Sequence, residues 1–239
     1  YHLTKLLFMR DHKPSKSAKN LRKSDPQRAE TINKVLSREY PNARCELDFR
    51  NPLELLVATV LSAQCTDARV NQVTPALFAK YPNAAAYAQA DPAQLEEILR
   101  PLGFQRAKTK HLLGIGERLL AHFGGEVPRG IKELTSLPGV GRKTALVVRG
   151  NAFGLPGLTV DTHFQRLVTR LGLTEKTTPV AIEKDIAGQL PEEEWTMFSH
   201  RLIFHGRAVC RARGPRCGDC VLAHLCPAAA EYGKSAPAQ

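Results

Sequence analysis

The chain has 239 residues, which is enough to bury a hydrophobic core in one domain or in two smaller ones. With 43% hydrophobic and 24% charged residues and no apolar run of about 20 residues, it has the composition of a globular protein, and we expect no membrane-spanning helix. The formal net charge of +11 favours a polyanionic partner, although a solvated basic surface is the simpler alternative.

The first 24 residues are basic and serine-rich without hydrophobic periodicity, so we expect a flexible tail over residues 1–24, with a targeting presequence as the alternative. The apolar segment LTKLLFM is too short for the core of a signal peptide. We therefore expect a cytoplasmic or nucleoid-associated protein that is not secreted. In such a reducing compartment its six cysteines would bind metal more readily than form disulfides.

From residue 25 onward the spacing of apolar residues is helical, with almost no strand-like alternation, so the predicted fold class is all-α. Asp25-Pro26, Asn51-Pro52 and Asp91-Pro92 each place a capping side chain before proline at the first helical position. Residues 52–64 are apolar on nearly every side, which predicts a buried central helix. The other helices are expected at 26–40, 67–80, 92–100, 106–123, 131–137, 142–153, 162–173, 179–190 and 191–209.

Two turns in the first half of the chain carry residues that allow two interpretations. The buried helix leads into a polar turn that runs from Gln64 to Asp67, and one interpretation is that Asp67 only caps the next helix. Further on, Gly103 permits a tight loop that would expose Phe104, whereas most phenylalanines turn into the core.

The stretch LPGVGRKTALVVRGNAFGLPGLTVDTH, residues 137–163, joins a glycine-punctuated turn to a helix. Gly139 and Gly141 have no Cβ, which allows positive φ and a close approach to another surface. The next helix begins with free N–H groups and the positive end of its dipole, which suits a phosphate oxygen. Lys143 lies in its first turn, and Asp161 begins another helical run eighteen positions later. An amine, an acid and a phosphate-binding turn together favour chemistry on a nucleic-acid sugar.

A nucleophilic lysine has to be neutral, while an exposed one has a pKa of about 10.4. Arg142 and the helix N-terminus both disfavour an ammonium at Lys143, and partial burial would add to that effect. The alternatives are a phosphate contact for Lys143 and a helix N-cap for Asp161.

Four cysteines lie within seventeen positions near the end of the chain: Cys210, Cys217, Cys220 and Cys226. A zinc site usually pairs two Cys-x2-Cys units across a longer spacer, and only one such unit occurs here. Four thiolates on a compact loop satisfy the ligation of a [4Fe–4S] cluster, which we predict as the cofactor. We expect Cys45 and Cys65 to be small buried residues.

The same loop carries three arginines, Arg211, Arg213 and Arg216, against Asp219 alone. They either offset the negative charge of four thiolates or form a second phosphate-binding surface that the cluster holds in place.

LPGVGRKT followed by VDTH resembles the helix-hairpin-helix and lysine–aspartate signature of endonuclease III-type DNA glycosylases, and the similarity extends over residues 26–227. The resemblance implies that the amine of Lys143 attacks C1′ of a flipped nucleotide, that a Schiff base permits β-elimination of the 3′ phosphate, and that Asp161 stabilises the charge on the sugar. It also implies phosphate binding by Gly139, Gly141 and Arg142. Monofunctional relatives lack a lysine at this position, so Lys143 implies a bifunctional glycosylase and AP lyase.

The resemblance extends to the base pocket and to the cysteine loop, whose spacing is similar to that of the family. It implies that Gln64 fills the gap left by the extruded base and that Asp67 and His163 line the pocket; for His163 an ordinary helix residue is the alternative. Extrusion is required because the bond to be cut is inaccessible in a stacked duplex. Phe104 would be the apolar wedge, although the family usually has leucine and tyrosine at this loop and Phe104-Gln105 departs from that pattern.

The fold implied by the resemblance has two helical domains with a DNA cleft between them. One, residues 45–155, is a multi-helix barrel that ends in the hairpin; the other, residues 25–44 with 156–239, holds the cluster. The expected function is base-excision repair of oxidised pyrimidines in duplex DNA, by a monomer. The alternatives are a uracil or thymine-mismatch glycosylase with weak lyase activity and a non-catalytic DNA-binding iron–sulfur protein.

Overall fold

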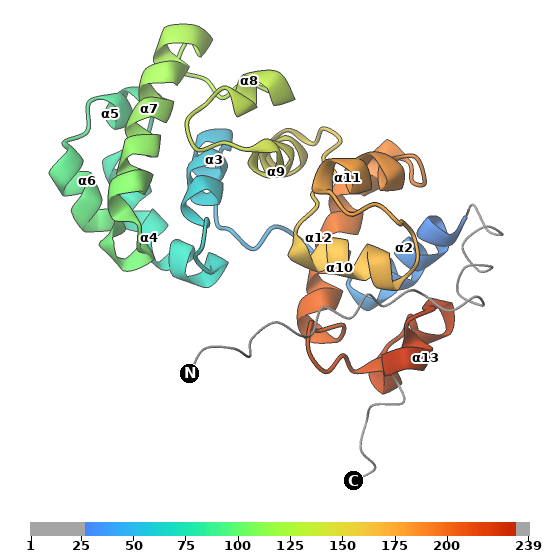
Figure 1. Ribbon diagram of the computed structural model, residues 1–239. Helices are drawn as coiled ribbons and strands as arrows, with labels where there is room; N and C mark the ends of the chain where they lie inside the picture. Colours follow the sequence, from blue (N-terminus) through green and yellow to red (C-terminus); the bar gives the residue numbers. More distant parts are fainter. Residues whose placement is uncertain (1–26, 233–239) are drawn as a thin grey trace, which may run out of the picture.

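A computed structural model describes residues 27–232, where every regular element is a helix and no strand occurs, which confirms the all-α class (Figure 1). The α-helices are α2 (Arg28–Glu39), α3 (Pro52–Leu61), α4 (Asp67–Lys80), α5 (Ala84–Ala88), α6 (Pro92–Leu99), α7 (Gln105–Phe123), α8 (Ile131–Thr135), α9 (Arg142–Phe153), α10 (Thr162–Arg170), α11 (Pro179–Ala187), α12 (Trp195–Ala208) and α13 (Ala229–Tyr232). Short 3-10 helices are η1 (Arg100–Leu102), η2 (Glu192–Glu194), η3 (Cys217–Asp219) and η4 (Ala223–Leu225). The predicted tail, residues 1–24, lies outside the described residues.

Two helices, α3 and α6, begin directly after the capping residues from which their starts were predicted. Asn51 Oδ1 accepts a hydrogen bond from the backbone N–H of Glu54 at 2.9 Å, and Asp91 Oδ1 accepts one from Gln94 at 2.8 Å. Proline follows each cap at the first helical position, as predicted. Each cap satisfies an amide that has no partner within its helix, which fixes where the helix begins. The third predicted pair, Asp25-Pro26, lies outside the described residues.

The polar turn after α3 differs from the prediction. α3 ends at Leu61 and not at Gln64, because hydrogen bonds from Cys65 N to Ser62 O and from Ala63 N to Val60 O turn the chain out of the helix. The cap of α4 is Thr66, whose Oγ1 accepts from Arg69 N at 3.3 Å, and not Asp67. The Asp67 carboxylate is therefore available for other contacts.

Other boundaries shift by a few residues. α8, α10 and α11 end two to three residues earlier than predicted. In α10 the cause is Gly172, whose φ of +68° turns the chain while the N–H of Leu173 bonds to the carbonyl of Val168. α12 begins at Trp195 after η2, and the short helix α5 was not predicted.

Two hydrophobic clusters organise the helices. α3 to α9 enclose one of them, in which α3 contributes fully buried residues such as Leu55 and Leu56. α2, α10, α11, α12 and the cysteine loop enclose the other. Figure 1 shows the two groups side by side, with α2 among the C-terminal helices although it comes first along the chain. The predicted domain boundaries at 44–45 and 155–156 stay predictions.

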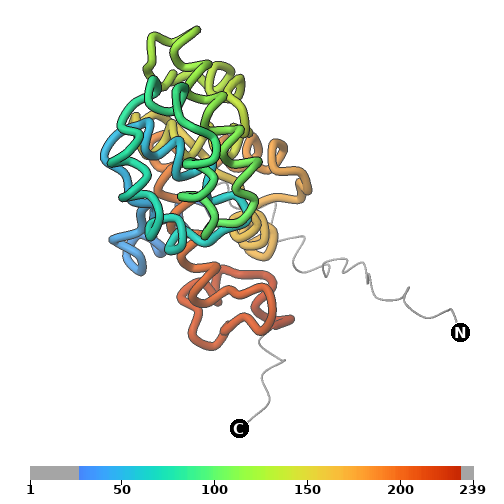
Figure 2. The backbone as a smooth tube through the Cα atoms, turned by 90° about the vertical axis from the view of Figure 1, so that its left-hand side faces the viewer, coloured from blue at the N-terminus to red at the C-terminus, as the bar shows by residue number. Residues whose placement is uncertain are grey.

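The two groups meet where α9 packs on α12. A Cβ on Gly150 would lie 2.5 Å from Thr196 Oγ1, so only glycine permits this close approach. Beside it, His200 Nε2 and Asn151 Oδ1 are 2.7 Å apart and share a hydrogen bond. The contact fixes how α9, which begins with Arg142 and Lys143, lies relative to α12. Figure 2 shows residues 210–226 as a compact coil at one end of the molecule.

Candidate active site

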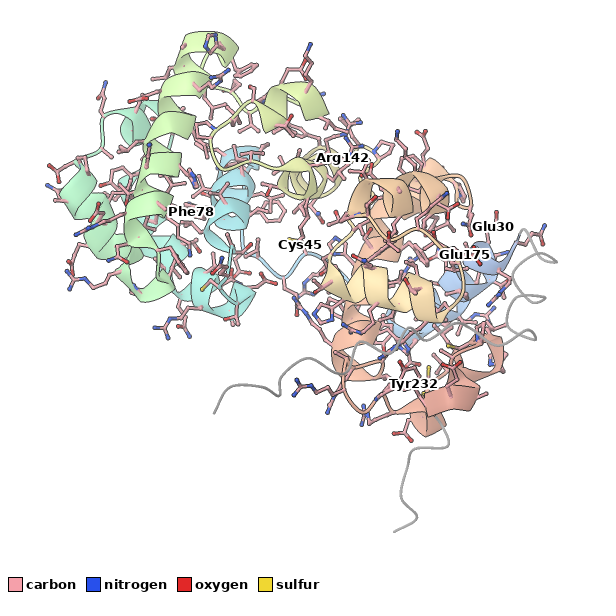
Figure 3. All side chains as sticks on the ribbon, in the orientation of Figure 1. Glu30, Cys45, Phe78, Arg142, Glu175 and Tyr232 are labelled. Carbon is pink, nitrogen blue, oxygen red and sulfur yellow. The ribbon has the colours of Figure 1, made fainter. Side chains whose placement is uncertain are left out.

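An open cleft lies between the two helical groups. Residues from α3, α4, α9, α10 and α12 line it, together with the segment that joins α2 to α3; in Figure 3, Cys45 marks that segment between the groups. Four of the predicted site residues line this one cleft: Asp67, Lys143, Asp161 and His163. Residues more than 90 positions apart in the sequence thus share a single cleft.

Lys143 is exposed in the first turn of α9, so the partial burial that would add to the effect of Arg142 and the helix N-terminus is not found. Among residues 27–232 its side chain forms no hydrogen bond and no ion pair. Asp161 is the N-cap of α10, because its Oδ1 accepts from the backbone N–H of Phe164 at 2.7 Å. This bond occupies one oxygen only; within the described part of the chain, Oδ2 has no hydrogen-bond partner. Capping and a place in the cleft are therefore compatible for Asp161.

Asp67 is half-buried and interacts electrostatically with both of these residues. Burial raises the pKa of Asp67, Lys143 opposes that rise, and Asp161 adds to it. Arg207 approaches the same carboxylate, with Nη2 3.3 Å from Asp67 Oδ2, and also forms an ion pair with Glu46. Arg207 was not predicted from the sequence, where it is one of many basic residues.

His200 is a second residue of the cleft that the sequence did not reveal. Burial lowers its pKa to about 4, so it is neutral at pH 7. The amide nitrogen of Asn151 donates to the carbonyl of Val147, which leaves Asn151 Oδ1 to accept from His200 Nε2. The histidine ring is thereby fixed in the wall of the cleft.

Gln64 and Phe104 do not line the cleft; each stands at an exposed turn. Their φ angles are +56° and +51°, and no other non-glycine residue of the described chain adopts the left-handed conformation. Phe104 is 63% exposed while its neighbour Leu102 is buried, so the interpretation of Phe104 as a core residue is wrong. For residues with a Cβ this conformation costs about 1–2 kcal/mol, so strain is stored at both turns.

In the turn between α8 and α9 the two predicted glycines behave differently. Gly139 has a φ of +74°, and a Cβ there would lie 2.7 Å from the ring of His111. Gly141 has a φ of −87°, so the expected positive φ is wrong for this residue, and a Cβ on it would meet no atom within 4 Å. No described side chain caps α9, which leaves its first N–H groups available to an anion.

Arg142, beside Lys143, is held by a carboxylate. Its Nε and Nη2 donate to the two carboxylate oxygens of Glu183 at 2.7 and 2.6 Å, and this hydrogen bonding raises the pKa of Arg142. Figure 3 shows Arg142 between α9 and α11. The charge that we expect to disfavour an ammonium at Lys143 is therefore partly compensated.

The four cysteines of the loop line one pocket. Arg170 Nη1 donates to Cys210 Sγ at 3.3 Å, and His205 Nε2 lies 3.3 Å from Cys220 Sγ. Burial raises the pKa of Cys226 to about 11, so its thiolate needs a bound metal to be stable. Within residues 27–232, no three His, Cys, Asp or Glu side chains are arranged so that they could hold a single metal ion. Four sulfurs that line one pocket, two of them within hydrogen-bond distance of a nitrogen, fit the Cys₄ ligation of a multi-iron cluster.

The three loop arginines are exposed. Arg216 is partly fixed, because its Nη2 donates to the carbonyl of Ala208 at 3.0 Å. The guanidinium groups of Arg211 and Arg213 form no hydrogen bond or ion pair with any described residue. Both are thus free to bind an anion at the end of the molecule that carries the cysteines.

A family model for HhH-GPD superfamily base excision DNA repair proteins matches residues 57–192. Endonuclease III of Synechocystis sp. is 54% identical over 207 residues, which cover 86% of this chain and 94% of the relative. The chain belongs to the endonuclease III family. The structure of a non-covalent endonuclease III–DNA complex superimposes with a TM-score of 0.84 and 42% identity, over 88% of this chain and 99% of that one.

A second endonuclease III structure is a trapped covalent intermediate with DNA. It has a TM-score of 0.82 and 43% identity and covers 87% of this chain and 98% of that one. These matches confirm the resemblance seen in the sequence and the helical fold. No helix within residues 27–232 has the length and apolar character needed to cross a bilayer.

Proposed function

We propose that Lys143 and Asp161 carry out in this chain the reactions of the endonuclease III family. The protein is a bifunctional DNA glycosylase and AP lyase of base excision repair, which removes oxidised pyrimidines and cleaves the strand 3′ to the resulting abasic site. The observation that carries the proposal is the shared cleft, which Lys143 from the start of α9 and Asp161 from the start of α10 both line.

In the first step the neutral amine of Lys143 forms a bond to C1′ of the extruded nucleotide. The glycosidic C–N bond breaks, and the base leaves with its electron pair and takes up a proton. Asp161 stabilises the positive charge on the sugar through its unpaired Oδ2, which also accepts a proton from the attacking amine. Oδ1 stays on the backbone N–H of Phe164, which holds the carboxylate in place.

In the second step the sugar ring opens to a Schiff base between Lys143 and C1′. This imine acts as an electron sink, so a proton leaves C2′ and the C3′–O bond breaks with loss of the 3′ phosphate. Water then hydrolyses the imine and regenerates the amine. Because Lys143 is exposed before DNA binds, duplex DNA itself has to supply the desolvation that favours the neutral amine.

The surfaces around the cleft complete the proposed complex with double-stranded DNA. The free N–H groups at Gly139, Gly141 and α9 bind a phosphate, and Arg142 joins them when phosphate displaces Glu183. Gln64 and Phe104 enter the duplex, Asp67 and His163 contact the flipped base, and the loop arginines bind a second phosphate. The loop arginines are Arg211, Arg213 and Arg216.

We assign a [4Fe–4S] cluster to Cys210, Cys217, Cys220 and Cys226, whose place in the fold suits it. When bound, the cluster supplies a structural cross-link for the loop. The sugar chemistry requires no electron transfer. We further propose the domain division at residues 44–45 and 155–156, a monomer, and action inside the cell.

Borohydride trapping tests the proposal. Wild-type protein with a duplex that carries an oxidised pyrimidine should give a covalent protein–DNA adduct, and Lys143→Ala should give none. A uracil or thymine-mismatch duplex processed faster than an oxidised one would favour the mismatch alternative. Absence of any adduct and any excision would favour the non-catalytic alternative.

A further inference from the structure

A buried lysine lies behind the exposed turn that carries Phe104. Lys108 of α7 is 4% exposed, and its Nζ donates to the carbonyl of Leu102 at 3.0 Å, its one hydrogen bond to the described residues. Burial lowers the pKa of Lys108, while the nearby Cys65 opposes that effect. A buried ammonium is unfavourable unless a partner holds it, so this lysine calls for an explanation.

The carbonyl that Lys108 holds belongs to Leu102, the last residue of η1, directly before the turn into α7. The preceding carbonyl, of Pro101, is held as well, because Arg69 Nε donates to it at 3.1 Å. Arg69 comes from the first turn of α4, directly after the Gln64 turn, and α4 packs on η1. Two cations thus fix two successive carbonyls before Phe104.

These contacts connect the two exposed turns, each of which contains a residue in the left-handed backbone conformation. Arg69 follows the Gln64 turn and reaches the Phe104 turn, while Lys108 supports the Phe104 turn and interacts electrostatically with Cys65 beside Gln64. A residue with a Cβ keeps a positive φ only where its surroundings hold it there. The two turns therefore depend on each other for their positions.

We propose that Lys108 is a positioning residue for base extrusion, which holds the Phe104 turn beside the Gln64 turn so that both enter the duplex together. This inference rests on the proposed function, since it requires an enzyme that extrudes a base. Lys108 touches neither the sugar nor the base; it acts through the carbonyl of Leu102.

The test compares Lys108→Met, which keeps the length of the side chain and removes its charge, with Lys80→Met. Lys80 is exposed at the far end of α4, about 20 Å along that helix from Asp67, and its loss changes the net charge equally. Single-turnover rates are measured on an oxidised pyrimidine in a matched duplex and on an abasic site in an unpaired bulge. The fluorescence of 2-aminopurine next to the lesion reports unstacking.

Lys108→Met should lower excision from the matched duplex about tenfold and suppress the 2-aminopurine signal, because opening a stacked pair is the step that the two turns assist. Cleavage at the unpaired abasic site should change less than about threefold, since little unstacking is needed there. Lys80→Met should match wild type on both substrates.

Equal losses of Lys108→Met on both substrates would overturn the inference, as would unchanged excision from the matched duplex. If Lys108→Met fails to fold, Arg69→Met provides the test, because Arg69 is exposed and holds the neighbouring carbonyl of Pro101. Arg69→Met should show the same selective defect. Inactive wild-type protein on both substrates would refute the proposed function instead, so the two failures are distinguishable.

Discussion

Arg207 of α12 reaches across the cleft to Asp67 of α4, with Nη2 3.3 Å from Oδ2. The two residues stand 140 positions apart and belong to different helical groups. With its ion pair to Glu46, Arg207 connects the groups at the mouth of the cleft that holds Lys143 and Asp161.

Replacing Arg207 with methionine should lower the free energy of unfolding by less than about 1 kcal/mol, because the pair with Asp67 is partly solvent-exposed. Excision of an oxidised pyrimidine should fall about tenfold, since Asp67 is then no longer fixed in the cleft. Thermal unfolding and single-turnover assays measure the two effects. Arg207→Lys should keep part of the activity, and an unchanged rate for Arg207→Met would show that the contact has no role in the reaction.

Two substitutions of Asp161 separate its capping from its charge. Asp161→Asn keeps an oxygen that accepts from Phe164 N, so stability should change by less than about 0.5 kcal/mol, whereas Asp161→Ala should lose about 1 kcal/mol. Both should lower excision by about 100-fold, because both remove the carboxylate. Chemical denaturation and excision assays provide the comparison. Full activity of Asp161→Asn would leave the residue with a capping role alone.

The hairpin glycines should respond differently to alanine. Gly139→Ala should destabilise the protein by about 1–2 kcal/mol, because φ is +74° and the added Cβ meets His111. Gly141→Ala should fold normally, since its φ is negative and the space is open, yet it should weaken DNA binding by placing a methyl group where the phosphate approaches. Thermal unfolding and a duplex-binding titration distinguish the two; equal destabilisation by both would contradict this account.

The neutral state of His200 should make stability depend on pH. Burial lowers its pKa from 6.5 to about 4, so between these values the unfolded chain binds a proton that the folded chain does not. Stability should be fully present above pH 6.5 and decline toward pH 4, by up to about 3 kcal/mol from this residue. His200→Asn should make the decline less steep without removing it, because burial lowers the pKa of His205 to about 4 as well. Midpoints of thermal unfolding measured across that range test this. An equally steep decline in the variant would assign the effect to other groups.

The iron content of the protein should depend on the four loop cysteines and on no other cysteine. Purified protein should contain about four irons per chain, and Cys217→Ser should lower that number and the visible absorbance. Cys65→Ser, outside the loop, is the matched control and should keep both. Stoichiometric zinc in a colourless wild-type protein would show that the cofactor assignment is wrong.

Local chemistry made much of this protein predictable. Asn51 and Asp91 mark helix starts because a capping side chain acts within three residues of itself. Asp161 likewise caps a helix through a contact three residues away. Its place in the cleft, in contrast, depends on residues far away in the sequence. The spacing of the hairpin and of the cysteines likewise identifies the family, since both are continuous stretches of sequence.

By itself, then, the sequence determined the helical class, the family and the residues of short continuous motifs, because those depend on neighbours a few positions apart. Only the tertiary structure decided that Arg207 reaches Asp67, that Glu183 holds Arg142 and that Gly141 does not take a positive φ. The physical reason is that two of these are contacts between side chains far apart in sequence and the third depends on the path of the whole turn. The two contacts are set by how the two hydrophobic cores pack together, and no local pattern of residues encodes that packing.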